Sequence, residues 1–475
     1  MARMVIRIVI FAVVLAVLVV AAGGGLFYAF NQHFYFAPPI ADYPKPASAL
    51  EAQRQDLDYF RKLMELDRSF SPVTRAQAER RIVELQELSS ALPQQKLHVA
   101  LMQIMTLADN GHTKMRAAVE GRKVLMAPLR IASFTEGFYV MRAKAPDRDM
   151  LGGRLESIDG VPFDQILHAF ETLRGGKEAF RRDSAAAYLP DQELLYGLGI
   201  ARAPDRSSWT VRLPDGRTVA HMIVAEPETD QPQYTHGRRW RSSQPMKAMG
   251  SDWLSALPAN ATRPLSEQDM DALFFRAPVP GSCAVYVRIE AIVDTNGQKI
   301  APFLKDTEGA FNAQPPCAVI LDLRGDGGGD YTNMWHFTHA LPDLIAHDGP
   351  IAVLTDAATF SAAITSTAFT KDAGGKRVTI IGEPVGDRLV FYAEGGGGTL
   401  PNSKFSLSFE TGKHDYAHPC RDWHDCFWLN WLYPVRVDSL QPDIDAPARF
   451  SDWNAGHDVA FEDAVALVNR KVARD

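Results

Sequence analysis

Two loops in the C-terminal part of the chain hold residue types that could carry out acyl-transfer chemistry. The first, Asp322–Asp330, has three consecutive glycines whose backbone N–H groups can form a nest for an anion; the alternative is a flexible turn. The second, Asp356–Ala363, places Ser361 between a strand and a helix. Its hydroxyl would lie beside the unpaired N–H groups of the helix N-terminus, which favour an oxyanion; the alternative is a serine that only caps the helix.

Neither loop matches two better-known motifs. No Lys-Ser/Thr follows the glycines, which argues against a Walker-type phosphate loop. Ser361 does not stand in a Gly-x-Ser-x-Gly elbow, so an α/β-hydrolase is not indicated.

Both loops belong to a predicted α/β core over residues 281–475. Strands are predicted for the β-branched runs and helices for two stretches between them, at Ala284–Ile289, Ala318–Leu323, Ile351–Thr355 and Val378–Gly382, and near Thr332–Leu341 and Ser361–Asp372. Strand–helix alternation predicts a parallel or mixed sheet with helices packed on its faces. Each loop follows a strand, so both lie at the carboxyl edge of the sheet, where the active sites of such folds are found.

The chain before the core divides into four predicted regions. Residues 1–30 form a membrane anchor or signal segment, and residues 31–115 a Pro-rich stalk followed by helices, one of them capped by Ser71 before Pro72. Residues 116–226 alternate short strands with an Asp159-Gly160 turn and an amphipathic helix over 163–173, which predicts a small β-rich module. Residues 227–280 are polar and irregular and form a connector.

The N-terminal segment predicts the compartment. Arg3 and Arg7 precede an uncharged apolar run from Ile8 to Phe30, which is long enough to cross a bilayer with the N-terminus in the cytosol. A cleaved signal peptide is the alternative, because small residues at 21–23 offer a cleavage site, but the apolar run continues past them. We therefore favour a single-pass protein of the inner (cytoplasmic) membrane, its catalytic part on the periplasmic side; cleavage would release it to the periplasm.

The composition is that of a globular protein. The 475 residues include 50 Lys+Arg and 57 Asp+Glu, a net charge of −7, and 46% are hydrophobic. This balance excludes a mainly disordered chain, and a net acidic chain without basic runs argues against nucleic-acid binding. Four cysteines are too few for a disulfide scaffold. The oligomeric state is left open.

Taken together with His112, the two loops resemble the C-terminal-processing (tail-specific) serine protease family and its tricorn-core relatives. Asp322–Gly329 is similar to the family's Asp-Leu-Arg-Gly-Asn-x-Gly-Gly, and Thr359–Ala362 to its Thr-x-Ser-Ala nucleophile segment. Further similarities follow the family's order in the chain, at Gly153–Pro162 (an inserted PDZ-like module), Gly382–Gly386 and Gln441–Ile444. The resemblance implies an α/β core of the ClpP/crotonase-like type and a peptidase without metal or organic cofactor.

One departure decides which base the resemblance implies. Bacterial processing proteases use a Ser–Lys dyad with the lysine just after the Gly-Glu-x-x-x-Gly segment, whereas here Gly386 is followed by Asp387-Arg388, and arginine cannot act as a base. The tricorn-like branch uses a Ser–His pair, and Asp109–Thr113 is similar to its Asp-Gly-His-Thr segment. His112 is therefore predicted to take the proton of Ser361.

The remaining site residues are less specified. The resemblance implies an oxyanion hole formed by the N–H of Ala362 and one N–H from Gly327 or Gly328. An acid that orients His112 is not identifiable from the sequence; the candidates are Glu383, Asp438 and Asp109.

A last cluster combines histidines and cysteines, at His414, His418, Cys420, His424 and Cys426. Its spacing fits no zinc-finger pattern, so we favour a Cys420–Cys426 disulfide in an exported domain over a metal site. The nearby aromatic residues (Trp423, Phe427, Trp428, Trp431 and Tyr433) are interpreted as core or as the wall of a substrate groove. Cys283 and Cys317 each open an apolar run and are predicted to be simply buried.

The sequence therefore predicts a membrane-anchored, exported serine peptidase that cleaves peptide or protein substrates through Ser361 and His112. The rival hypothesis is a peptide- or lipid-binding protein on the same fold that has lost catalysis. The rival would be favoured if Ser361 and His112 lay well beyond hydrogen-bond reach in the structure with no hinge that could close the gap.

Overall fold

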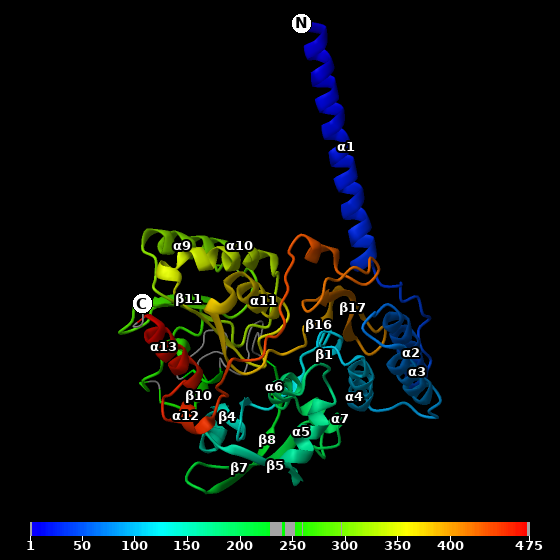
Figure 1. Ribbon diagram of the computed structural model, residues 1–475. Helices are drawn as coiled ribbons and strands as arrows, with labels where there is room; N and C mark the ends of the chain where they lie inside the picture. Colours follow the sequence, from blue (N-terminus) through cyan, green and yellow to red (C-terminus); the bar gives the residue numbers. More distant parts are fainter. Residues whose placement is uncertain (1, 229–239, 243–251, 259, 296, 473–475) are drawn as a thin grey trace.

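The computed structural model describes residues 2–228, 240–242, 252–258, 260–295 and 297–472. Part of the predicted connector over 227–280 lies outside these ranges. Within them the protein is a mixed α/β molecule with several sheets, and a long N-terminal helix projects from the body (Figure 1).

The core is a six-stranded sheet in the order β11-β12-β13-β14-β15-β18. Its first pair is antiparallel and the other neighbours are parallel, as the strand–helix alternation predicted. The strands are β11 (Phe274–Pro278), β12 (Val285–Ile289), β13 (Val319–Asp322), β14 (Ile351–Thr355), β15 (Val378–Gly382) and β18 (Ile444–Asp445).

Helices cover both faces of this sheet because successive strand residues point to opposite sides. Val353 and Leu321 pack with α9 (Ile300–Ala313), α10 (Thr332–Ala340) and α11 (Ala362–Gly374) on one side. Leu354 and Ile320 pack against α13 (Val459–Val472) on the other, and the short α12 (Phe450–Asn454) precedes α13.

A second, seven-stranded antiparallel sheet occupies the lower part of Figure 1. Its strands are β3 (Leu129–Phe134), β4 (Gly137–Lys144), β5 (Arg154–Ile158), β6 (Val161–Pro162), β7 (Arg206–Arg212), β8 (Thr218–Val224) and β10 (Trp253–Ser255). The helices α5 (Phe163–Glu171), α6 (Glu178–Tyr188) and α7 (Gln192–Gly197) accompany it. The sheet draws on most of the predicted module and takes β10 from the predicted connector.

A third sheet joins segments that are far apart in the sequence. The strand β1 (Lys114–Val119) pairs with β17 (Phe405–Asp415), and β17 pairs with β16 (Val390–Thr399). The start of the predicted module therefore contributes to a sheet built mainly from the C-terminal part of the chain. A small ribbon of β2 (Leu125–Met126) and β9 (Glu226–Pro227) lies apart from these sheets.

The N-terminal region is helical, with α1 (Ala2–Phe34), α2 (Ala49–Glu65), α3 (Pro72–Gln86) and α4 (Gln94–Met105). Ser71 caps α3 and Pro72 occupies its first turn, as predicted. Within the described part of the chain, no helix is both long enough and apolar enough to cross a membrane.

Candidate active site

Ser361 lies on the sharp turn between β14 and α11, in a backbone conformation that serine rarely adopts. Its φ is 56° and its ψ is −122°, and its side chain makes no capping hydrogen bond although it occupies the N-cap position of α11. Positive φ in a residue other than glycine is strained and persists only where the surrounding structure imposes it. The capping alternative for Ser361 is therefore wrong, and a strained serine at a strand-to-helix turn is the geometry of a nucleophile.

Hydrogen bonds from both sides hold the Ser361 turn in this conformation. The carboxylate of Asp356 accepts the N–H groups of Ala358 and Thr359, each at 3.0 Å. The Thr359 hydroxyl donates to the Leu323 carbonyl at 2.9 Å, and the Phe360 N–H donates to the Asp326 carbonyl at 2.9 Å. These bonds fasten the turn to the glycine loop that follows β13, so the two loops singled out in the sequence form one unit.

The glycine loop lies directly against Ser361. A Cβ built at Gly328, whose φ is +104°, would lie 2.6 Å from the Cβ of Ser361 and 2.9 Å from the nitrogen of Ala362. Only glycine fits there without displacing the Ser361 turn.

Two of the three predicted oxyanion donors remain available. The N–H of Gly328 donates to Asp326 Oδ1 at 2.8 Å, so its assignment as an oxyanion donor is corrected. The N–H groups of Gly327 and Ala362 have no acceptor among the residues that the structure describes. Burial raises the pKa of Asp326 well above its usual range.

His112 stands on a turn between α4 and β1 that four contacts hold in place. Asn110 bonds to both backbone groups of Tyr392 on β16, at 2.9 and 3.1 Å. The Gly111 N–H donates to Asp387 Oδ2 at 3.1 Å, and the Thr113 hydroxyl donates to Asp67 Oδ2 at 2.9 Å. His112 thus follows the N-terminal helices in the sequence, but its turn is hydrogen-bonded to the C-terminal sheet.

The imidazole of His112 lies between two phenyl rings. Its centroid is 4.4 Å from that of Phe360, the neighbour of Ser361, and 5.4 Å from that of Phe391. Both ring nitrogens are buried and have no hydrogen-bond partner among the described residues. Burial, helped by the positive charges of Lys114 and Arg174, holds the pKa of His112 well below its usual value.

The structure therefore brings Ser361, Ala362 and Gly328 into contact and places His112 beside Phe360, but Ser361 and His112 are not hydrogen-bonded. Catalytic hydrogen bonds often tighten only when substrate binds.

None of the three candidate acids orients His112. Asp109 forms an ion pair with Arg388 at 2.7 Å, and Glu383 accepts the Ala448 N–H at 3.0 Å. Asp438 is exposed. Both nitrogens of His112 lack a partner within the described ranges, so none of the three carboxylates is hydrogen-bonded to the imidazole.

The departure at Asp387-Arg388 has a structural explanation. Asp387 is almost fully buried and accepts the Gly111 N–H, while Arg388 donates to both the carbonyl and the carboxylate of Asp109. At the position where the family resemblance would place a lysine, this chain has Asp387 and Arg388. Both bond to the turn that carries His112. Sequence reasoning noted the substitution but could not find this contact, because the two segments are 276 residues apart.

Sequence reasoning also missed a column of stacked rings at the site. Phe180 on α6 stacks on Phe360 with centroids 4.3 Å apart, and on the far side Phe391 stacks on His414 at 5.0 Å. Phe360 and His112 lie between them. The column links the second sheet's helices, the Ser361 turn and the β16–β17 hairpin, and no spacing in the sequence signals it.

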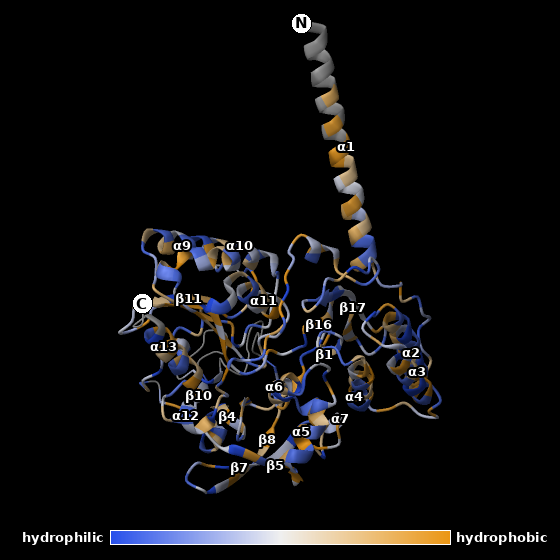
Figure 2. Ribbon diagram, in the orientation of Figure 1, coloured by the Kyte–Doolittle hydropathy of each residue, from blue (hydrophilic) through white to orange (hydrophobic). Residues whose placement is uncertain are grey.

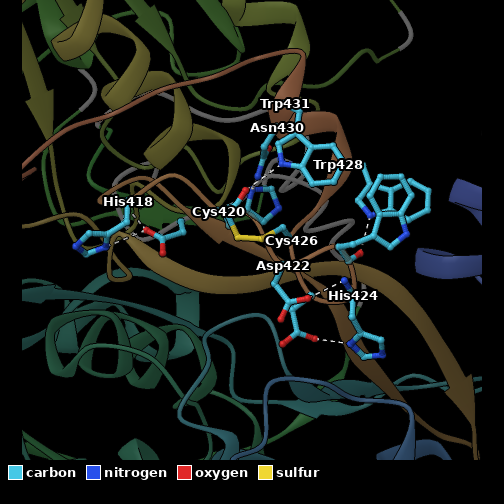
Figure 3. The surroundings of a disulfide bond; sticks show 12 residues. His418, Cys420, Asp422, His424, Cys426, Trp428, Asn430 and Trp431 are labelled. Carbon is cyan, nitrogen blue, oxygen red and sulfur yellow. Dashed lines mark hydrogen bonds and ion pairs between the residues drawn. A yellow bond between two sulfur atoms is a disulfide. The ribbon is translucent and has the colours of Figure 1, made fainter.

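The cysteines form two disulfides. Cys420 and Cys426 are bonded, as we favoured over a metal site (Figure 3). Cys283 and Cys317 are also bonded, so the prediction that they are simply buried is wrong. They precede β12 and β13, and the parallel register that pairs Val285 with Val319 brings them to the same end of the sheet.

No protein-family model matches this chain, and no curated protein matches its sequence. Solved structures do resemble it. Mature CPAF complexed with lactacystin aligns with 90% of this chain and 100% of its own, at 13% identity and a TM-score of 0.58. A CPAF serine-to-alanine mutant aligns with 90% of this chain and 98% of its own, at 13% identity and a TM-score of 0.59. The chain has the fold of CPAF.

At 13% identity the likeness to CPAF establishes the shared fold. The tricorn protease also aligns, at 13% identity over 89% of this chain and 37% of its own, with a TM-score of 0.39. The PDZ-like character of the second sheet and the membership of the tricorn-like branch stay predictions.

Proposed function

We propose that this protein is a serine peptidase that hydrolyses peptide bonds in peptide or protein substrates. The observation that carries the proposal is the strained backbone of Ser361, with φ 56°, at the N-terminus of α11 and against the glycine loop. A hydroxyl held in this way next to unpaired N–H groups suits attack on a carbonyl carbon and stabilisation of the resulting oxyanion. The fold shared with CPAF agrees with this assignment.

In the proposed mechanism His112 acts as the general base. Once substrate is bound, the imidazole takes the proton of Ser361 Oγ as the oxygen attacks the scissile carbonyl. The tetrahedral oxyanion accepts hydrogen bonds from the N–H groups of Ala362 and Gly327. The amine leaves with the proton from His112, and water then repeats the sequence on the acyl-enzyme. The low pKa of His112 keeps the imidazole neutral, the form that a base requires.

We further propose that the peptidase is exported and anchored in the cytoplasmic membrane by residues 8–30. Two disulfides involve all four cysteines, and disulfides persist in oxidising compartments such as the periplasm. The apolar N-terminal run supports the anchor.

The rival, a binding protein without catalysis, is favoured by one observation, the absence of a Ser361–His112 hydrogen bond. The ligand of such a protein would be a peptide or a lipid. A binding role gives no functional reason for the strained backbone of Ser361.

The test uses the full chain in detergent, as wild type and as the Ser361→Ala, His112→Ala and Ser366→Ala variants. Ser366 is a matched control because it lies one turn further along α11 and its hydroxyl bonds only within the helix. Each protein is incubated with a pool of unstructured peptides, read by mass spectrometry, and separately with a fluorophosphonate probe for activated serines. Cleavage and labelling by wild type and Ser366→Ala, lost in the other two, would support the proposal. Labelling of wild type without cleavage would mean a narrow substrate range. Neither labelling nor cleavage would favour the binding protein.

A further inference from the structure

Three exposed apolar side chains lie in, or a few residues after, the loop that the Cys420–Cys426 disulfide closes, near the end of α1 that joins the body. Trp423, Trp431 and Leu432, here called the tryptophan patch, are 57%, 41% and 71% exposed. The sequence interpretation of Trp423 and Trp431 as core is therefore wrong, whereas Trp428 between them is buried. A cluster of exposed apolar side chains on a folded surface indicates an interaction site.

A disulfide, a hydrogen bond and ring contacts fix the tryptophan patch in position. The Cys420–Cys426 disulfide closes the loop (Figure 3), and the indole N–H of Trp431 donates to the Cys420 carbonyl at 3.1 Å. The rings of Trp423 and Trp431 lie 5.3 Å apart, and Trp423 packs on Trp428 at 4.2 Å. Because the N–H of Trp431 is satisfied within the loop, its outward face is left to apolar contact.

The same loop holds the last turn of α1. His33 stacks on Trp428 at 5.1 Å, and its Nε2 lies 2.7 Å from the His424 carbonyl oxygen. Phe30 packs on Phe427 at 5.3 Å. The tryptophan patch is thus fixed relative to the point where α1 leaves the body (Figure 1).

Beyond that point many of the coloured residues of α1 are apolar, as Figure 2 shows, and several large apolar side chains there are exposed. They run from Phe11, 69% exposed, to Tyr28, 66% exposed, and include Leu18, Val20 and Phe27 between them. Eighteen residues of α-helix span about 27 Å, close to the roughly 30 Å thickness of a bilayer's hydrocarbon core. When lipid surrounds this stretch, the last turn of α1 lies at the depth of the lipid headgroups. The tryptophan patch beside that turn then lies at the same depth.

We propose that the tryptophan patch docks into the interfacial layer of the lipid bilayer that surrounds α1. Tryptophan is enriched at this level of membranes because its ring is apolar and its N–H polar. The docked loop is a second contact beside the helix and sets the orientation of the Ser361 site relative to the membrane. The proposal shares with the proposed function only the anchor at residues 8–30 and is independent of the chemistry at Ser361.

The test exploits the absence of free cysteines in the chain. Leu432→Cys adds a single thiol in the patch, and Met222→Cys adds one at an equally apolar position, 60% exposed, on β8 at the opposite end of the molecule (Figure 1). The full chain carrying an NBD label at either site is placed in phosphatidylethanolamine–phosphatidylglycerol vesicles. Flotation reports anchoring, nitroxide-labelled lipids report contact with the bilayer, and aqueous iodide reports exposure to water.

We expect the label at 432 to be quenched at least threefold more strongly by shallow nitroxide lipids than the label at 222, and less by iodide. Equal, water-like behaviour of both labels in protein that floats would overturn the docking and leave the anchor standing. Protection of the label at 432 from iodide without quenching by lipid would also overturn it, in favour of a second copy covering the patch. Protein that does not float would overturn it too, whatever the peptide-cleavage result, which tests Ser361 separately.

Discussion

Gly328→Ala tests whether the glycine loop positions the nucleophile. The added Cβ would lie 2.6 Å from the Cβ of Ser361, about 1 Å short of the roughly 3.5 Å that two carbons need. The Ser361 turn and the glycine loop must separate by most of that difference, against the hydrogen bonds to Leu323 and Asp326 that join them. A displacement of this size at a catalytic group costs on the order of 100-fold in rate.

The same substitution also strains the backbone, since Gly328 has a φ of +104°. Alanine at such a position costs about 1–3 kcal/mol of folding stability. A matched control separates this cost from the steric one: Gly216, in the turn between β7 and β8, has a φ of +87°, and a Cβ there would meet nothing within 4 Å. Gly216→Ala should lose a similar free energy of unfolding and keep the activity of wild type.

The assay compares kcat/KM for a peptide found in the cleavage screen with urea unfolding of the full chain in detergent. We expect Gly328→Ala to fold and to cleave about 100-fold more slowly than Gly216→Ala. If Gly328→Ala cleaves within threefold of that control, the glycine loop does not set the position of Ser361, and the assignment of the oxyanion hole falls with it.

Three further results are expected. Ser361→Gly and Ser361→Ala should both be inactive. The glycine variant should have a free energy of unfolding higher by about 1 kcal/mol than the alanine variant, because only glycine adopts a φ of 56° without strain. Equal stability of the two variants in urea would argue against strain at this position. Replacing Cys283 and Cys317 by serine opens a loop of 34 residues and should lower the free energy of unfolding by about 4 kcal/mol in the loop-entropy account; a loss under 1 kcal/mol would contradict this account. Burial lowers the pKa of His112, so the inactive protonated form arises only at lower pH. The acid limb of kcat/KM, which reports the free enzyme, should therefore fall below pH 6.5. A limb at or above pH 6.5 would mean that His112 is not the base.

Short-range patterns in the sequence predicted the four central strands of the core sheet, but not its outer strands β11, which lies in the predicted connector, and β18. The strands at Ile351–Thr355 and Val378–Gly382 have the predicted bounds, and α11 begins directly after Ser361. Buried strands of β-branched residues and helix-starting turns are local properties, so neighbouring residues suffice to reveal them. The Cys420–Cys426 disulfide was accessible for the same reason, since six residues separate its cysteines.

Contacts between distant segments could not be read in this way. The pairing of Lys114 with Ser408, the bond from Gly111 to Asp387 and the Cys283–Cys317 disulfide each depend on how the sheets pack. Nothing near these positions in the sequence favours one distant partner over another, because the partner depends on how the sheets pack in the folded chain.

The candidate site shows both kinds of information. Residue types and order in the sequence pointed to Ser361, Ala362 and the glycine loop as a group, and the structure brings Ser361, Ala362 and Gly328 together. Only the tertiary structure decided that His112 lies between Phe360 and Phe391 without a hydrogen-bonded acid. A local pattern specifies which chemical groups a turn presents, but their distances and partners arise from the packing of segments that meet only in the folded chain.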